Sequence, residues 1–430
     1  MNLHNRPIDP MKILFLTENF PPETNAAATR VYERAVFWAR EGHDVTVLTC
    51  APNFPHGRLF PGYRNAWRHV GEMDGIRVVR VKTFIAPNRG VLLRALDFVS
   101  FFFTALFFGL REPRPDVIAA TSPQFFAAVA GWLLGRFRRL PFVFELGDLW
   151  PASISAVGAM RENVLLRAME KLELHLYRQS ATVVALTQAF KDNLVRRGIP
   201  AEKIAVVING VDLSRYAPTP RDPDLAEVWD LQDSFTVGYV GTHGMAHGLT
   251  NVIDAAERLV DLPDLRIVLV GAGAEREKVF MDARQRRLKN VVLIPPQPKD
   301  AMTRVWSLCD VALVHLSNSP VFAEVIPSKI FEAMGMGLPV LLASPEGEAS
   351  RIVEADGSGL WVPAEDPDAL AAAIRKLHGD ANLRKGLRET SLAMAPTHSR
   401  AVQARKMLAA LTCAAQGKGA EASDAVDRVT

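Results

Sequence analysis

The 430-residue chain contains only three cysteines, and their spacing matches no metal-binding motif. Cys50, Cys309 and Cys413 are scattered along the sequence, and histidine forms no cluster with them, so we predict no metal site. With so few thiols, a reducing compartment is expected. The polar start MNLHNRPIDP is not followed by an apolar signal core, and we therefore expect that the protein is not exported.

Several catalytic motifs are also missing. The sequence has no Walker loop and no Gly-x-Ser-x-Gly elbow. Residues 271–273, Gly-Ala-Gly, resemble half of a dinucleotide fingerprint but lack its third glycine, so an NAD-dependent oxidoreductase has little support. Two Asp-Pro-Asp segments, at residues 222–224 and 366–368, match a metal-binding Asp-x-Asp pattern. Each precedes a helical run, which favours an Asp N-cap with proline in the first turn.

The length of the chain is typical of two domains. Apolar strand-like runs alternate with helical patterns, as in parallel sheets covered by helices on both faces, and the pattern restarts near residue 210. We predict an α/β fold of two doubly wound, Rossmann-like units that face one another. The predicted strands lie at residues 12–17, 45–49, 76–82, 116–120, 142–146 and 182–186, and then at 235–240, 266–270, 291–294, 311–315 and 339–343.

The segment 324–332, EVIPSKIFE, holds two carboxylates on either side of a predicted helix start. Ser328 fits an N-cap, and the helical run from Lys329 ends at glycines. Free N–H groups, the helix dipole and the Lys329 charge would attract phosphate. Glu332 is placed to face a sugar hydroxyl, and Glu324 to accept hydrogen bonds from a second polyol. A diphosphate between two hydroxyl-bearing rings describes a nucleotide sugar. The alternative is a capped helix with two solvated acids, and the spacing alone does not decide between them.

Ligands of doubly wound sheets bind outside the carboxyl ends of the strands. The candidate loops of this sequence all follow predicted strands, and a ligand between the two units would touch every one of them. These loops are residues 18–29, 147–151, 241–248, 271–274 and 324–332.

Residues 61–140 carry an excess of seven positive charges and include an apolar, phenylalanine-rich run at residues 91–110. Arg94 and Asp97 interrupt this run, and its uninterrupted part is too short to span a bilayer. A phenylalanine-rich helix flanked by arginine suits a membrane interface. The alternative is a buried core helix of the first domain.

Taken in order, the motifs resemble those of a GT-B retaining glycosyltransferase of family 4. The resemblance covers residues 11–412, and its DLWP and PSK pieces are most similar to bacterial fucosaminyltransferase-like enzymes of O-antigen, capsule and colanic-acid assembly. The residues that carry it are MKILF at 11–15, PPE at 21–23, GHDV at 42–45, DLWP at 148–151, NGVD at 209–212 and the segment 324–332.

The resemblance implies a domain layout with a ligand cleft between two Rossmann-like domains. After a tail at residues 1–10, the acceptor-binding domain would cover 11–212 and the nucleotide-sugar-binding domain 213–395. A helix at 396–412 would pack back on the first domain, and we expect residues 413–430 to form a disordered tail.

The resemblance also implies residue roles. Glu332 would hold the ribose hydroxyls, Glu324 the transferred sugar, and Lys329 with the helix N–H groups the diphosphate. Asp148 would face the acceptor and the sugar, so Glu324, Asp148 and Lys329 are the catalytic candidates. The remaining donor-binding candidates are Ser328, Gly241, Thr242, His243, His247, Gly271, Gly273, Gln297, Asn25 and Ala26.

The sequence departs from the family pattern at three places. Asn25 and Ala26 stand where a Gly-Gly pair is usual, and Thr242 and His247 stand where an Arg and a Lys are usual. Gly147 precedes Asp148 where many relatives have a histidine. These departures bear on how the pyrophosphate charge is neutralised, since Lys329 is left as the main fixed cation.

We therefore expect a retaining, metal-independent glycosyltransferase that needs no cofactor. It would move an amino or deoxy sugar from a UDP-linked donor to a lipid-linked or glycan acceptor in surface polysaccharide biosynthesis. The leaving phosphate could itself take the acceptor proton, and His243 or His247 could supply a proton or a positive charge. The expected location is cytoplasmic, peripheral on the cytoplasmic face of the inner membrane, and no nucleic acid is expected as a partner.

Two alternatives remain. The first is a nucleotide-sugar epimerase or hydrolase of the same architecture. In such an enzyme the basic, phenylalanine-rich segment would have no function. The second is a non-catalytic nucleotide-sugar-binding protein, which the departures from the family pattern leave open. The presence of Glu324, Lys329 and Glu332 weighs against the second alternative.

Overall fold

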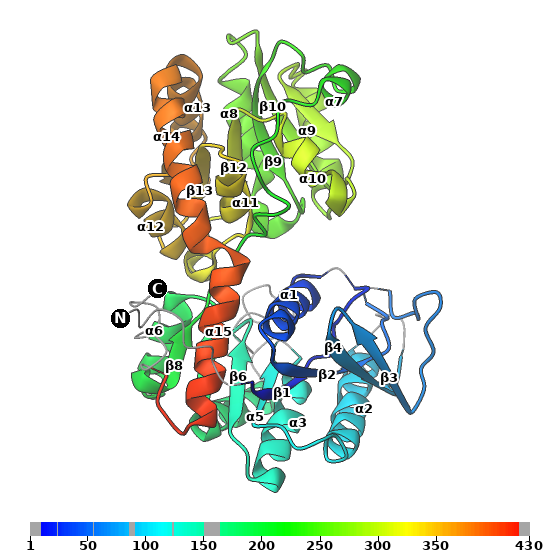
Figure 1. The fold of residues 1–430 in the computed structure, drawn as a ribbon. Helices are drawn as coiled ribbons and strands as arrows, with labels where there is room; N and C mark the ends of the chain where they lie inside the picture. Colours follow the sequence, from blue (N-terminus) through cyan, green and yellow to red (C-terminus); the bar gives the residue numbers. More distant parts are fainter. Residues whose placement is uncertain are drawn as a thin grey trace. The chain divides into compact units, whose positions relative to one another are not determined.

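The computed structural model describes residues 10–420 except 24, 55, 86–90, 123 and 150–163. The chain divides into two compact units (Figure 1). Unit 1 comprises residues 1–208 together with 403–430, and unit 2 comprises residues 209–402. The divisions therefore fall at 208 and 402, where we predicted 212 and 395. Nearly all of the predicted N-terminal tail, the end of the 147–151 loop and residues 421–430 lie outside the described residues.

In its described part, unit 1 forms an eight-stranded sheet in the order β3-β4-β2-β1-β5-β6-β7-β8, in which only β3 is antiparallel to its neighbour. The strands are β1 (Lys12–Leu16), β2 (Asp44–Cys50), β3 (Arg68–Met73), β4 (Ile76–Val81), β5 (Val117–Thr121), β6 (Phe142–Leu146), β7 (Thr182–Ala185) and β8 (Ile204–Val206). The helices are α1 (Ala26–Arg40), α2 (Val91–Gly109), α3 (Phe125–Arg138), α5 (Val164–Gln179) and α6 (Gln188–Arg196).

Both faces of this sheet are buried. Leu14 and Leu16 of β1 belong to one core, whereas Ile13 and Phe15 belong to the other, as the alternation of side chains along a strand requires. The first core includes residues of α2, α3 and α5, and the second includes residues of α1. Because both faces are covered, the strands are continuous apolar runs, which made them recognisable in the sequence.

The C-terminal helix α15 (Arg400–Ala415) completes the second core of unit 1. Met407 and Leu411 join this core, and Trp38 Nε1 donates to the Ala404 carbonyl oxygen at 2.9 Å. The structure corrects the predicted disordered tail at residues 413–430 in its first part. Cys413 is buried, and Ala420 N donates to Glu202 O at 2.8 Å, because the alanine-rich end of the helix packs on the sheet.

Unit 2 forms a parallel six-stranded sheet in its described part, in the order β11-β10-β9-β12-β13-β14. The strands are β9 (Phe235–Val240), β10 (Leu265–Val270), β11 (Val291–Ile294), β12 (Val311–His315), β13 (Val340–Ser344) and β14 (Gly359–Pro363). The helices are α7 (Pro223–Val228), α8 (Leu249–Glu257), α9 (Arg276–Gln285), α10 (Met302–Trp306), α11 (Lys329–Gly335), α12 (Glu348–Ala355), α13 (Pro367–Gly379) and α14 (Ala381–Met394). The Asp222 and Asp366 side chains cap α7 and α13, so the N-cap interpretation of both Asp-Pro-Asp segments is confirmed.

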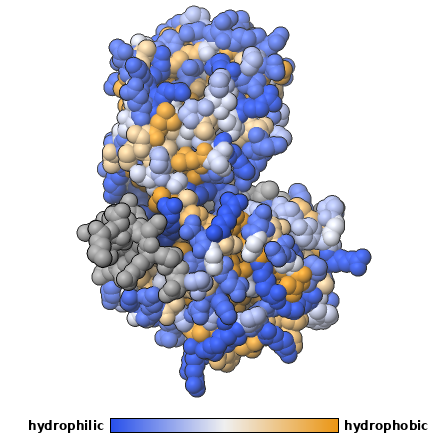
Figure 2. All heavy atoms as spheres, viewed as in Figure 1, coloured by the Kyte–Doolittle hydropathy of each residue, from blue (hydrophilic) through white to orange (hydrophobic). Residues whose placement is uncertain are grey.

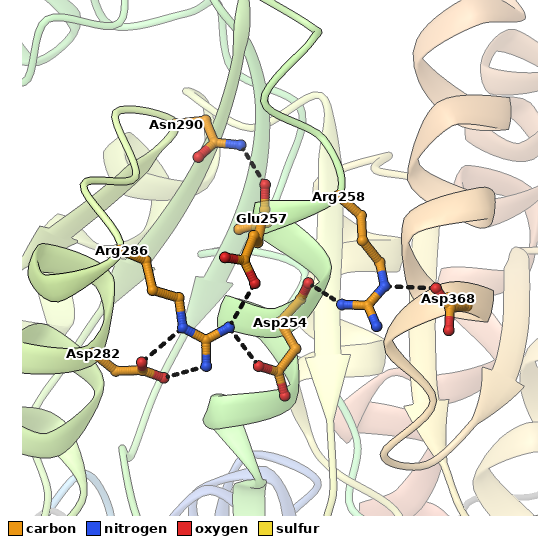
Figure 3. Close-up of polar contacts among 8 residues, drawn as sticks. Asp254, Glu257, Arg258, Asp282, Arg286, Asn290 and Asp368 are labelled. Atoms are coloured by element: carbon orange, nitrogen blue, oxygen red, sulfur yellow. Dashed lines mark hydrogen bonds and ion pairs between the residues drawn. The ribbon is translucent and has the colours of Figure 1, made fainter.

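Charged side chains join the outer helices of unit 2 (Figure 3). The Arg286 guanidinium donates to Asp254 of α8 at 2.7 Å and to Asp282 of α9 at 2.8 Å. Arg258, the residue after α8, donates to Asp368 of α13 at 2.5 Å. Every acid drawn is paired with an arginine, so this cluster fastens helices and offers no free carboxylates to a ligand. Because these side chains are all accessible to solvent, water screens each pair and its contribution to stability is small.

The sequence analysis missed the strands β3, β8 and β14. β3 is a polar edge strand whose residues are mostly exposed, so it carries no apolar run. Asp74 and Gly75, both with positive φ, form the two-residue turn between β3 and β4. An Asp-Gly pair is a typical hairpin signal, and it could have revealed this strand.

Candidate functional site

Three glycines meet at the carboxyl ends of β9 and β10 in unit 2. Gly241 follows β9 with φ 148°, and Gly271 follows β10 with φ 150°. A side chain at Gly271 would overlap the Gly241 carbonyl oxygen, and one at Gly273 would overlap the backbone of His243. The two loops therefore pack backbone against backbone, which only glycine permits at these φ angles.

Lys329 of α11 reaches the first of these loops. A Cβ atom at Gly241 would lie 2.7 Å from Lys329 Nζ, so the ammonium occupies the space that glycine leaves. Lys329 Nζ lies 4.4 Å from the centroid of the Tyr239 ring and donates to Tyr239 Oη at 3.2 Å. Tyr239 Oη in turn donates to Thr242 O at 2.7 Å. Strand β9 thus positions the cation against the backbone of the glycine loop.

Burial lowers the pKa of Lys329 from 10.5 to about 8, although the nearby Glu332 carboxylate opposes the shift. Burial also raises the pKa of Glu332, which lies one turn further along α11. The ammonium is therefore a desolvated cation without a full counter-charge. An anion bound beside Gly241 would stabilise the charged form of Lys329.

The histidines of this region favour their neutral forms. Burial lowers the pKa of His247 to about 4, and that of His315 to about 4 as well. His315 Nδ1 lies 2.8 Å from His247 O, and its Nε2 lies 2.8 Å from Asn251 Nδ2, so it is a structural residue. His243 is fully buried, and burial lowers its pKa although a backbone hydrogen bond with Val270 opposes the shift. At neutral pH, His243 and His247 can offer hydrogen bonds but not the positive charge we expected of them.

The Ser328 side chain does not cap α11, contrary to the prediction. Ser328 is exposed, has helical φ and ψ of −59° and −23°, and makes no side-chain capping bond. A capping residue needs an extended conformation to direct its hydroxyl at the first free N–H groups. The helix has only seven residues, so Lys329 rather than the helix end supplies the main attraction for an anion.

The remaining donor candidates of unit 2 lie at the same end of the sheet. Glu324 closes the 3₁₀ turn Pro320–Glu324 after β12 and is half-buried. This turn is tightly packed, because a side chain at Gly347 would overlap the Ala323 carbonyl oxygen. Gln297 is half-buried beyond the end of β11, and its side chain donates to Pro295 O at 3.0 Å. Contacts therefore bring together Gly241, Thr242, Gly271, Gly273, His243 and Lys329, with His247 reached through the Tyr239 ring.

In unit 1, the candidates Asn25, Ala26 and Asp148 follow β1 and β6. Asn25 Oδ1 accepts from Ala28 N at 2.9 Å and caps α1, which explains why asparagine suits a position where relatives have glycine. Ala26 is the exposed first residue of α1, and Asp148 is half-buried. A side chain at Gly147 would overlap Ser122 O and lie 2.8 Å from Arg30 Nη2. The packing thus excludes the histidine that many relatives have there.

Sequence reasoning missed a buried ion cluster beside Gly147. Arg30 Nε donates to Glu145 Oε1 at 3.1 Å, Arg30 Nη2 donates to Thr121 Oγ1 at 3.2 Å, and Arg34 also pairs with Glu145. The two arginines lower the pKa of Glu145 despite its burial. The cluster thus places two arginines around one buried carboxylate at the ends of β5 and β6. The glutamate within the apolar strand FVFEL was the signal that could have found this cluster.

Two further polar side chains at this edge of unit 1 were missed. Glu18 and Gln124 are buried, and one oxygen of each, Oε1, has no hydrogen-bond partner among the described residues. Burial raises the pKa of Glu18 well above its usual value, and Asp97 and Glu23 add to the shift. Buried polar atoms are rarely left without a partner, so this edge is suited to receive hydroxyl groups.

Two Rossmann-like units with such loops at their carboxyl edges define a class of nucleotide-binding protein, and comparison with known families identifies it. Residues 25–210 match the glycosyl transferase 4-like domain, and residues 224–393 match the glycosyl transferases group 1. The chain therefore belongs to the GT4-like glycosyltransferases, as the sequence motifs predicted, and is an enzyme of this class.

Two relatives illustrate the family. WcaI of Escherichia coli (strain K12), named as a colanic acid biosynthesis glycosyl transferase, is 28% identical over 338 residues, which cover 76% of this chain and 82% of WcaI. A GDP-mannose-dependent alpha-mannosyltransferase of Mycobacterium tuberculosis (strain CDC 1551 / Oshkosh) is 26% identical over 331 residues, which cover 77% and 78% of the two chains.

Solved structures confirm the fold. Anabaena Alr3699/HepE, crystallised with UDP and glucose, has a TM-score of 0.69 at 21% identity and covers 93% of this chain and 98% of its own. WaaG, a glycosyltransferase involved in lipopolysaccharide biosynthesis, has a TM-score of 0.62 at 15% identity, with 93% and 99% covered. The predicted GT-B architecture of two Rossmann-like domains is thereby confirmed.

The glycine loops generate a testable prediction. Gly271→Ala should lower the free energy of unfolding by about 1–3 kcal/mol, because it adds backbone strain and displaces the Gly241 loop. Gly386→Ala is the matched control, since Gly386 lies within α14 with open space around it. It should stabilise the protein by about 0.5–1 kcal/mol. Denaturant unfolding measures both, and equal effects of the two substitutions would contradict the packing described here.

Proposed function

We propose that this glycosyltransferase moves a sugar from a UDP-linked donor to a lipid-linked or glycan acceptor in surface polysaccharide biosynthesis, with retention of configuration. The observation that carries the proposal is the desolvated Lys329 ammonium held against the Gly241 loop. The names of WcaI and WaaG support a role in polysaccharide assembly, and the UDP complex of HepE supports the donor. An amino or deoxy sugar stays a prediction from the sequence, as does a cleft between the domains.

The chemistry of such a transfer is mainly electrostatic. Breaking the bond from the sugar carbon to the diphosphate places negative charge on the leaving oxygen. Lys329 is preorganised to stabilise this charge, because Tyr239 holds its ammonium against the Gly241 loop before the donor arrives. The amides of Gly241, His243 and Gly271 already donate to backbone carbonyls, so other amides of the two loops would add to this stabilisation. In this proposal Thr242, His243 and His247 add only neutral hydrogen bonds to the diphosphate.

The other roles follow the family pattern. Glu332 would bind the ribose hydroxyls and Glu324 the transferred sugar, while Gln297 would lie near the base. In unit 1, Asp148 would position the acceptor or stabilise the cationic sugar, and Asn25 with Ala26 would face the donor. The departing phosphate would take the acceptor proton on the same face of the sugar, which gives retention without an enzymic base, a metal or a cofactor.

A donor screen tests the proposed function. The purified protein would be incubated with UDP-, GDP- or dTDP-sugars and membrane extract, and mass spectrometry would follow lipids of higher mass. A UDP-sugar that yields a heavier lipid supports the proposal. Free UDP or an isomerised sugar without acceptor would favour a hydrolase or epimerase, and transfer only from a GDP-sugar would overturn the choice of donor.

The shifted pKa of Lys329 predicts how UDP binding depends on pH. The amine is charged below pH 8 and neutral above, so affinity should fall from pH 7 to 9.5, by up to about tenfold per pH unit above 8. Calorimetric titration at constant ionic strength measures this. Lys329→Arg is the control, because arginine stays charged over the whole range and should give a flat profile. The same decline in both proteins would exclude Lys329 as the titrating group.

Glu332→Gln should lower kcat/KM for transfer by about 100-fold or more, because hydrogen bonds to a charged group are worth about 1.5–3 kcal/mol each. The fold should persist, since glutamine keeps the size of the side chain. Glu354→Gln, an exposed change on α12, is the control and should leave the rate unchanged. Full activity of the Glu332 variant would refute its assignment to the ribose.

A further inference from the structure

One face of α2 is apolar but lies outside the core. Phe101 and Ala105 of this helix are buried in the first core of unit 1, whereas Leu96, Phe103 and Phe107 are 46%, 63% and 51% exposed. Leu93 and Leu110, the residue after the helix end, are exposed too, and the intervals of three, seven, four and three residues place all five side chains in one stripe. The core interpretation of the sequence therefore holds for one face of this helix, and the other face is apolar and exposed.

The stripe continues onto neighbouring elements. Phe84 is 40% exposed, and its N–H donates at 2.7 Å to Ser100 Oγ, which lies within the stripe. At the other end, Arg138 of α3 donates to Gly109 O at 3.1 Å and so ties the ends of α2 and α3 together. Phe137, next to Arg138, is 62% exposed. In Figure 2, hydrophobic residues interrupt the hydrophilic surface of unit 1.

Exposed arginines surround the end of this apolar surface. Arg111 and Arg114 follow α2, and Arg136 and Arg139 lie at the end of α3; none has an ion-pair partner among the described residues. The Arg111 guanidinium lies 3.5 Å from the centroid of the Phe107 ring. The adjacent acid, Glu112, is buried and already paired with Arg68 and Arg77. The surface around the phenylalanines therefore carries uncompensated positive charge.

We propose that the stripe of α2, together with Phe137 and the four arginines, is a docking surface for an anionic lipid bilayer. Aromatic and leucine side chains would enter the boundary between headgroups and acyl chains, and the arginines would bind lipid phosphates. The occupant is chosen by charge complementarity, because arginines without an ion-pair partner among the described residues stand beside exposed phenylalanines and match the phosphates above the acyl chains of an anionic bilayer. The inference rests on the proposed function, because a lipid-linked acceptor requires the enzyme at a membrane.

The mode of attachment would be peripheral. No helix in the described part of the chain is both long and apolar enough to cross a bilayer. The buried face of α2 cannot leave the core without exposing Phe101 and Ala105. The helix would therefore lie in the plane of the interface, with Phe103 and Phe107 directed into the lipid.

Co-sedimentation with vesicles tests the docking surface. The wild-type protein should bind vesicles that contain phosphatidylglycerol, and it should bind pure phosphatidylcholine at least about tenfold more weakly. Phe103→Ser with Phe107→Ser should weaken binding to anionic vesicles at least about tenfold. Arg136→Gln with Arg139→Gln should remove much of the preference for anionic lipid, and raised salt should do the same.

A double variant in unit 2 provides the control. Phe280→Ser with Met281→Ser removes two exposed apolar side chains from α9 and should leave vesicle binding unchanged. UDP affinity and thermal unfolding of the α2 variant should match the wild type, because its changed residues are exposed. Equal binding of the wild type and the α2 variant to anionic vesicles would overturn the inference. It would also be overturned if the wild type did not bind vesicles and the α2 substitutions changed only its self-association in size-exclusion chromatography. If the wild type bound vesicles but not UDP, the proposed function would be overturned instead.

Discussion

The contact between the Gly241 and Gly271 loops is the constraint on which the candidate donor site depends. Any side chain at Gly271 would strike the Gly241 carbonyl oxygen, and any side chain at Gly241 would displace Lys329. The backbones of the two glycine loops and the Lys329 amine therefore occupy a space that side chains would otherwise fill. This arrangement gives a partly desolvated cation beside the glycine loops, which is costly for the empty protein and favourable once an anion arrives.

In unit 1, too, a glycine leaves room for a charged side chain. The absent side chain at Gly147 leaves room for Arg30, which with Arg34 neutralises a glutamate buried within the sheet. Close packing there explains why this chain departs from the family pattern: a histidine would collide with Ser122 O. The buried cluster of Arg30, Arg34 and Glu145 gives this edge of unit 1 its own electrostatic character.

The regular part of the fold was predictable because parallel strands covered on both faces are continuous apolar runs. The predicted bounds of β6, β9, β11 and β12 agree with the structure residue for residue. β3 was not predictable in this way, because an edge strand exposes polar side chains. Ser328 was misjudged because composition cannot show that its backbone is helical. Arg30 and Glu145 are 115 residues apart, so only the folded sheet brings them together.

The return of α15 to unit 1 has a consequence for biosynthesis. The second core of unit 1 includes Met407, Leu408 and Leu411, which the ribosome makes only after the whole of unit 2. Until then, the apolar side chains of β1 and α1 that meet these residues lack their cover. The second core of the first domain is therefore incomplete while some two hundred further residues are translated. During this period, binding by a chaperone would protect the exposed apolar side chains from aggregation.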